Sequence, residues 1–148
     1  MSDSPPTQKR CGKAGSGITV VLVDTSVWIE FLDRNNPSVR RDLEALLRQG
    51  VVATAGLVLS ELRSGCQSRQ QAVRLLQAME PLVYLEADRG AYLRAGELAA
   101  ECSARGFRIG IADCLLATLA MRESASVFTL HRDFERIPRL RLFRKQGP

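Results

Sequence analysis

This sequence of 148 residues has few side chains suited to structural zinc or to a disulfide framework. It contains one histidine, and its four cysteines form no CxxC pair, whereas common structural zinc sites need four Cys or His ligands. The composition therefore argues against structural zinc. It favours free thiols at all four cysteines, which are Cys11, Cys66, Cys102 and Cys114.

Long apolar runs are also absent. No segment approaches the roughly 20 apolar residues of a membrane-spanning helix, and the first residues lack the apolar segment of a signal peptide. We therefore expect a soluble, cytoplasmic protein without membrane contact. Residues 1–17 are polar and rich in Gly, Ser and Pro, which predicts a disordered tail. Residues 18–145 then form one domain, long enough for a sizeable apolar core.

Lysine is scarce, although the net charge is +5. Lys9, Lys13 and Lys145 are the only lysines, so every cation between Ala14 and Arg144 is an arginine. The planar guanidinium of arginine matches phosphate well, and a positive balance favours a polyanionic partner. A genome of high GC content would produce the same preference for arginine, so this composition alone does not identify a nucleic-acid ligand.

Short apolar segments alternate with amphipathic ones, which predicts an α/β fold with a central parallel sheet flanked by helices. The expected strands are residues 18–23, 51–54, 82–85, 126–129 and 140–143. The expected helices are residues 27–32, 38–49, 55–65, 68–79, 88–105 and 112–123. In the helix of residues 88–105, the pattern places Tyr92, Leu93 and Leu98 toward the core.

Four acidic residues follow a strand end or open a helix instead of lying on a polar helix face, and they are Asp24, Glu61, Asp113 and Asp133. The carboxyl ends of parallel strands share one edge of the sheet, so these acids could converge. Converging carboxylates repel one another unless a divalent cation neutralises them. All-oxygen ligands favour Mg²⁺ or Mn²⁺, and such a site suits phosphodiester hydrolysis.

The acidic residues also have simpler interpretations than a metal site. Asp24 could merely cap the helix that follows it, and Asp133 could cap the turn before Phe134. Arg63, Arg108 and Arg132 lie near the acidic motifs in sequence and could hold RNA phosphates, but a solvated or ion-paired face explains them equally well.

Four segments together resemble the PIN-domain family, most closely its VapC-type toxins. They are VDTSVWIEFL, LSELRSG, IGIADCLLATLA and FTLHRDFERIP, and the resemblance extends from Ile18 to Phe143. It implies a Mg²⁺-dependent endoribonuclease, with Mn²⁺ as a possible substitute, acting on RNA in the cytoplasm. It also implies a parallel sheet of order 3-2-1-4-5, a homodimer and neutralisation by a cognate VapB-type antitoxin.

The resemblance also suggests roles for individual residues. Asp24 and Asp113 match the principal metal ligands, and Glu61 matches an acid that orients or activates water. The fourth acidic position of the family is His131 in this sequence, with Asp133 two residues further on. Either residue could fill that position. Ser26, His131 and Arg63 are candidates for contacts around the metal or the substrate.

Two rival functions share features with this sequence. A PIN-like module that binds nucleic acid or protein without cleaving is compatible with the histidine at the fourth acidic position. Aspartyl-phosphate chemistry also uses an aspartate at a strand end. Families with that chemistry resemble one another in needing a lysine near the phosphate, and residues 18–144 contain none.

Overall fold

The computed structural model describes residues 18–33 and 36–144. The predicted disordered tail of residues 1–17 lies outside the described residues. Within the described part, no helix combines the length and apolar character needed to cross a membrane. The three cysteines that are described, Cys66, Cys102 and Cys114, are free thiols, as predicted.

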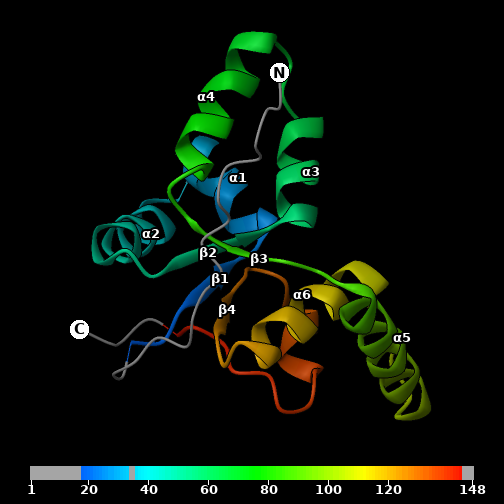
Figure 1. The fold of residues 1–148 in the computed structure, drawn as a ribbon. Helices are drawn as coiled ribbons and strands as arrows, with labels where there is room; N and C mark the ends of the chain where they lie inside the picture. The colour runs from blue at the N-terminus through cyan, green and yellow to red at the C-terminus, as the bar shows by residue number, and fades with distance from the viewer. Residues whose placement is uncertain (1–17, 34–35, 145–148) are drawn as a thin grey trace.

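A four-stranded parallel sheet forms the centre of the fold, in the order β3-β2-β1-β4 (Figure 1). In the central strand, Leu22 pairs with Ala53 on one side and with Val127 on the other. This arrangement confirms the predicted α/β class. The strands are β1 Val21–Val23, β2 Val52–Ala55, β3 Val83–Leu85 and β4 Ser126–Phe128.

The predicted fifth strand, residues 140–143, is reduced to one parallel bridge between Leu142 and Val127. Two backbone hydrogen bonds hold it, from Val127 N–H to Arg141 O at 2.9 Å and from Phe143 N–H to Val127 O at 2.8 Å. Just before it, Arg139 has a φ of 67°, a left-handed conformation that interrupts an extended chain. The sheet order is therefore 3-2-1-4, with one bridge where the fifth strand was expected.

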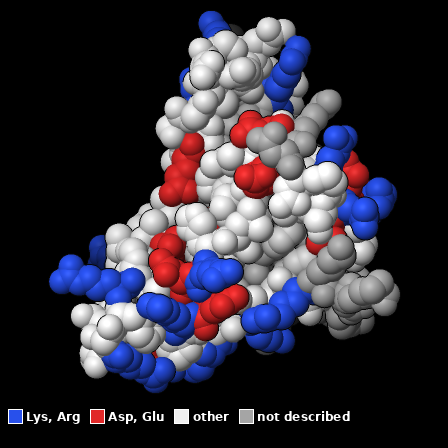
Figure 2. Space-filling model, turned by 180° about the vertical axis from the view of Figure 1, so that it is seen from behind, with Lys and Arg blue, Asp and Glu red and all other residues white. Residues whose placement is uncertain are grey.

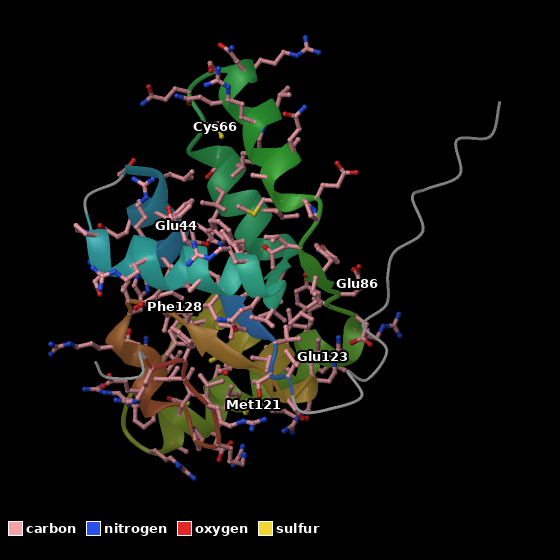
Figure 3. The ribbon with its side chains drawn as sticks, turned by 90° about the vertical axis from the view of Figure 1, so that its left-hand side faces the viewer. Glu44, Cys66, Glu86, Met121, Glu123 and Phe128 are labelled. Atoms are coloured by element: carbon pink, nitrogen blue, oxygen red, sulfur yellow. The ribbon has the colours of Figure 1, made fainter. Side chains whose placement is uncertain are left out.

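Helices cover both faces of the sheet, with α3 and α4 forming a hairpin on one side and α5 and α6 packed together on the other (Figure 1). Figure 3 shows Cys66 near the tip of the α3–α4 hairpin, with Met121 and Glu123 in the lower half of the view. The helices are α1 Thr25–Asp33, α2 Pro37–Gln49, α3 Gly56–Ser64, α4 Arg69–Met79, α5 Arg89–Ala104 and α6 Ile111–Arg122.

Helix α6 is the most buried helix beside the sheet. Every residue of 114–120 is buried, because this helix packs against β1 and β4 on one side and α5 on the other. A helix held so firmly gives a fixed position to Asp113, which lies in its first turn.

The sequence pattern assigned the wrong face to part of α5. Tyr92 is 59% exposed and Leu93 is 64% exposed, although both were expected in the core. The buried face instead consists of Ala91, Ala95, Leu98 and Cys102, whose spacing follows the turns of a helix. Small side chains on this face let α5 lie close to α6, and the larger residues project outward.

Candidate active site

Asp24 lies directly after β1 and is buried, with 4% of its surface exposed. Its Oδ1 accepts a hydrogen bond from Thr25 N–H at 2.8 Å. Its Oδ2 accepts one from Ser26 Oγ at 2.7 Å and another from Thr129 Oγ1 at 2.8 Å. An ordinary helix-capping side chain accepts from the second or third N–H of the helix, so Asp24 does not act as a conventional cap.

Glu61 is joined to the first turn of α1, although it belongs to α3. The hydroxyl of Thr25, the residue after Asp24, donates a hydrogen bond to Glu61 Oε2. Glu61 is itself exposed, so the rest of its carboxylate faces solvent. The carboxylates that follow β1 and β2 are therefore brought to the same edge of the sheet.

Asp113 completes this acidic group from the opposite side of the sheet. It is half-buried, and burial is the largest cause of its raised pKa. The negative charges of Asp24, Glu61 and Asp133 raise the pKa further, while the nearby His131 lowers it. Asp113 is therefore within electrostatic range of the other three predicted acids and of the histidine.

His131 and Asp133 lie on the segment that follows β4. Both are exposed, and Asp133 is within a short 3₁₀ helix, Arg132–Arg136, whose Phe134 is fully buried. His131 N–H donates to Thr129 Oγ1 at 3.0 Å, and Leu130 N–H donates to Ser26 Oγ at 3.1 Å. Both candidates for the fourth position are within electrostatic range of Asp113, where His131 lowers its pKa and Asp133 raises it.

None of the ion pairs between described residues involves Asp24, Glu61, Asp113 or Asp133. The arginines near these motifs in sequence, Arg63, Arg108 and Arg132, are exposed and likewise form no such pair within the described residues. A cluster of acids without basic partners is costly in free energy.

The donor set fits a hard divalent cation held by few protein ligands. No group of three or more His, Cys, Asp or Glu side chains within residues 18–33 and 36–144 already surrounds a common point at ligand distance. Mg²⁺ does not require such a cage, because it keeps several waters and uses one or two carboxylates. Asp24 and Asp113 supply oxygen atoms of the required kind.

Thr129 is a site residue that the sequence pattern does not single out. Its hydroxyl contacts Asp24, 105 positions earlier in the chain, so no local spacing indicates the contact. Thr25 is also more central than expected, because it holds both Asp24 and Glu61.

The family model of the PIN domain matches residues 21–140, which include all of these positions. This chain belongs to the PIN-domain family. The match spans the sheet, both helical layers and the segment that carries His131. Nucleases of this family are generally metal-dependent, which agrees with the all-oxygen acidic site.

Named relatives of this PIN domain include two bacterial ribonucleases. Ribonuclease VapC2 of Rickettsia felis is 27% identical over 126 residues, covering 82% of this chain and 94% of the relative. Ribonuclease VapC21 of Mycobacterium tuberculosis is 29% identical over 104 residues, covering 68% and 75% respectively.

Solved structures with the same fold include toxin–antitoxin complexes. The VapBC2 complex of Rickettsia felis, bound to a DNA fragment from its promoter, matches with a TM-score of 0.72 and 26% identity, over 84% of this chain and 98% of the other. The DNA-bound VapBC of Salmonella typhimurium has the same TM-score at 23% identity, covering 85% and 98% respectively, which supports the fold alone.

Proposed function

We propose that this PIN domain is a Mg²⁺-dependent endoribonuclease and the toxin of a VapBC-type toxin–antitoxin pair. The observation that carries the proposal is the arrangement of the acids: Thr25 hydrogen-bonds both Asp24 and Glu61, and Asp113 in the first turn of α6 is within range of both charges, which with burial raise its pKa. Acids collected in this way, without ion-pair partners in the described residues, suit a site completed by a cation from solution. The named VapC ribonucleases among the relatives support RNA as the substrate.

In the proposed mechanism, Asp24 and Asp113 hold the metal ion, for which Mn²⁺ is a possible substitute. When held by these two residues, such an ion would supply the positive charge needed to activate a water and to stabilise the attacked phosphate. Asp24 is preoriented by its hydrogen bonds and keeps one lone pair of Oδ1 for the ion. Glu61, which accepts a hydrogen bond from the Thr25 hydroxyl and is exposed to solvent, would orient the attacking water.

Asp133 completes the acidic set in this proposal, and His131 and Arg63 contact the RNA. Asp133 and His131 are both exposed on the segment after β4, so a phosphodiester can reach them. Arg63 lies two residues beyond Glu61 on α3 and has no ion pair in the described structure, which leaves its guanidinium available for a phosphate.

The proposal extends to partners and organisation. A VapB-type antitoxin is an expected protein partner, as the VapBC complexes among the solved structures suggest. A second copy of the chain is expected from the resemblance to VapC-type toxins. Residues 18–145 would act as one nuclease unit in the cytoplasm, where RNA is available.

Purified protein tests the proposed chemistry directly. Wild type should cleave RNA when Mg²⁺ or Mn²⁺ is added and stop when EDTA removes it. Asp24→Asn should abolish cleavage with an unchanged circular dichroism spectrum, because the amide cannot replace the ionised ligand. Asp42→Asn, a matched change on α2, should cleave like wild type. Full activity of Asp24→Asn would reject the proposed mechanism.

One observation supports a second candidate, a PIN module that binds RNA without cutting it. The fourth acidic position of the family is an exposed histidine here, which removes one negative charge from that position. This alternative predicts RNA binding by wild type and Asp24→Asn alike, with no cleavage in either at any metal concentration.

A further inference from the structure

Two hydroxyl groups connect Asp24 to the segment after β4. Ser26 Oγ and Thr129 Oγ1 both donate to Asp24 Oδ2, at 2.7 and 2.8 Å. Each hydroxyl also accepts a backbone N–H from that segment, Ser26 from Leu130 and Thr129 from His131. We propose that this hydroxyl pair, Ser26 and Thr129, positions the Asp24 carboxylate and the 130–133 segment as one unit. The inference rests on the proposed nuclease function.

Counting lone pairs shows what the hydroxyl pair does to Asp24. A carboxylate oxygen has two lone-pair directions, and both directions of Oδ2 are occupied by hydroxyl donors. Oδ1 accepts only the Thr25 N–H at 2.8 Å. The pair therefore turns one oxygen inward and leaves Oδ1 as the oxygen with capacity for a cation. Rotation of the carboxylate would break all three hydrogen bonds at once.

The two hydroxyls also fix the segment after β4, because each has lone pairs left to accept hydrogen bonds. A hydroxyl has one hydrogen, and in both residues that hydrogen points to Asp24. The remaining lone pairs then accept the N–H groups of two successive residues, Leu130 and His131. Each hydroxyl therefore joins Asp24 on one side to a backbone N–H of the 130–133 segment on the other, and every donor in this network has one acceptor.

The consequence reaches the rest of the site through His131 and Asp133. Both lie on this segment, His131 at the N-cap and Asp133 in the first turn of its short 3₁₀ helix. Buried Phe134 anchors the far end of this segment, and the hydroxyl pair fixes its near end. Loss of one hydroxyl should therefore weaken metal binding by changing the orientation of Asp24 and the segment together, although neither hydroxyl needs to touch the ion.

Thr129→Val tests this positioning role because it keeps the shape of the side chain and removes its hydroxyl. Thr129→Ser restores the hydroxyl. Thr54→Val is the matched control, since Thr54 is 1% exposed and its hydroxyl has no hydrogen-bond partner among the described residues. Mn²⁺ affinity is measured by calorimetry on the full chain, and the Leu130 and His131 amides are followed by ¹H–¹⁵N NMR without metal.

We expect Thr129→Val to weaken Mn²⁺ binding by about 10- to 100-fold, the usual effect of losing a partner of a metal ligand. The His131 amide should shift and exchange faster in the same variant. Thr129→Ser should recover most of both properties, and Thr54→Val should match wild type. Should Thr129→Val fold poorly, Ser26→Ala provides the same test from the other hydroxyl, with Leu130 as the reporting amide.

Wild-type Mn²⁺ affinity and an unchanged His131 amide in Thr129→Val would overturn the inference. A lower melting temperature without a change in Mn²⁺ affinity would also overturn it, because it would indicate a purely structural role. The NMR result does not depend on catalysis. Failure of wild type to cleave RNA would therefore reject the proposed function while leaving the positioning of the 130–133 segment separately measurable.

Discussion

Carboxylates occupy two contrasting settings in this molecule. At the carboxyl ends of β1 and β2, acids gather around Asp113, and burial together with their charges raises its pKa. Along α5 and at its N-cap, the acidic side chains form ion pairs with arginines. Arg139 donates hydrogen bonds to Glu101 and lowers its pKa, while the Ala91 N–H and Arg122 lower the pKa of Asp88.

The ion-paired carboxylates of α5 stabilise the fold, whereas the carboxylates around Asp113, which form no ion pair within the described residues, are available to a ligand. Arg139 and Arg141 attach the C-terminal segment, through Glu101 and through the Ser124 carbonyl respectively. Arg136 lies over the ring of Phe107 at 5.8 Å. These three arginines therefore have contacts within the fold. On the lower part of the face in Figure 2, basic side chains adjoin acidic ones.

Of the substitutions that test this contrast between the two settings, Asp113→Asn should have the largest effect. We expect RNA cleavage to fall by about 100-fold or more, because a proposed metal ligand is lost. Without divalent ions, the melting temperature at neutral pH should rise. A carboxyl whose pKa is raised by folding destabilises the folded state once the pH exceeds its unfolded pKa, and the amide removes that cost. Calorimetry in EDTA and a parallel cleavage assay measure both effects.

Asp88→Asn is the matched control for that experiment. Its pKa is lowered by hydrogen bonds from Ala91 and Arg122, so the same chemical change should lower the melting temperature and spare cleavage. A melting temperature that falls in both variants would remove the proposed distinction between the two settings.

His131→Ala should have a smaller effect on cleavage than Asp113→Asn. The structural role of His131 in the hydroxyl network uses its backbone N–H, which alanine retains. Only the electrostatic influence of the imidazole on Asp113 and any contact with RNA would be lost. We expect a fall of about 10-fold at most. Rates of the two variants, measured side by side at saturating metal, give the order; the reverse order would make His131 the main group at the fourth position.

Arg132→Gln should weaken RNA binding by a few-fold, whereas Arg139→Gln should not. Arg132 is exposed, forms no ion pair in the described structure and lies beside His131. Arg139 is paired with Glu101 at 3.2 Å. Loss of a phosphate contact should raise KM and reduce its salt dependence, with kcat little changed. Equal KM values for the two variants at low salt would argue against this assignment.

The sequence indicates where the acidic residues lie in the fold, but it does not indicate the hydrogen bonds that hold them. The apolar run before Asp24 and the helix that carries Asp113 in its first turn are local patterns, and parallel topology then brings their ends to one edge. The hydrogen bond from Thr129 to Asp24 joins residues 105 positions apart, and nothing near Thr129 indicates its partner. Distant pairing of this kind depends on the final packing.

The errors in fold prediction have equally specific causes. Residues 140–143 have the composition of a strand, but the left-handed conformation of Arg139 just before them limits pairing to a single bridge. Tyr92 and Leu93 are apolar at helical spacing, but the close approach of α5 to α6 uses a face of smaller residues. Apolar character alone does not distinguish a core position from an exposed apolar surface.

Glu101→Gln should produce the smallest effect and should depend on pH. Arg139 lowers the pKa of Glu101 in the folded state, so this carboxylate contributes stability above its unfolded pKa and loses it as pH falls through the folded pKa. The variant should therefore melt at most a few degrees below wild type at neutral pH, and the difference should vanish in acid. Glu97→Gln, which removes a more exposed pair within α5, should change less. A difference that persists in acid would show that Glu101 stabilises α5 and the C-terminal segment by packing and not by its charge, and the contrast with the acidic site would then rest on Asp88 alone.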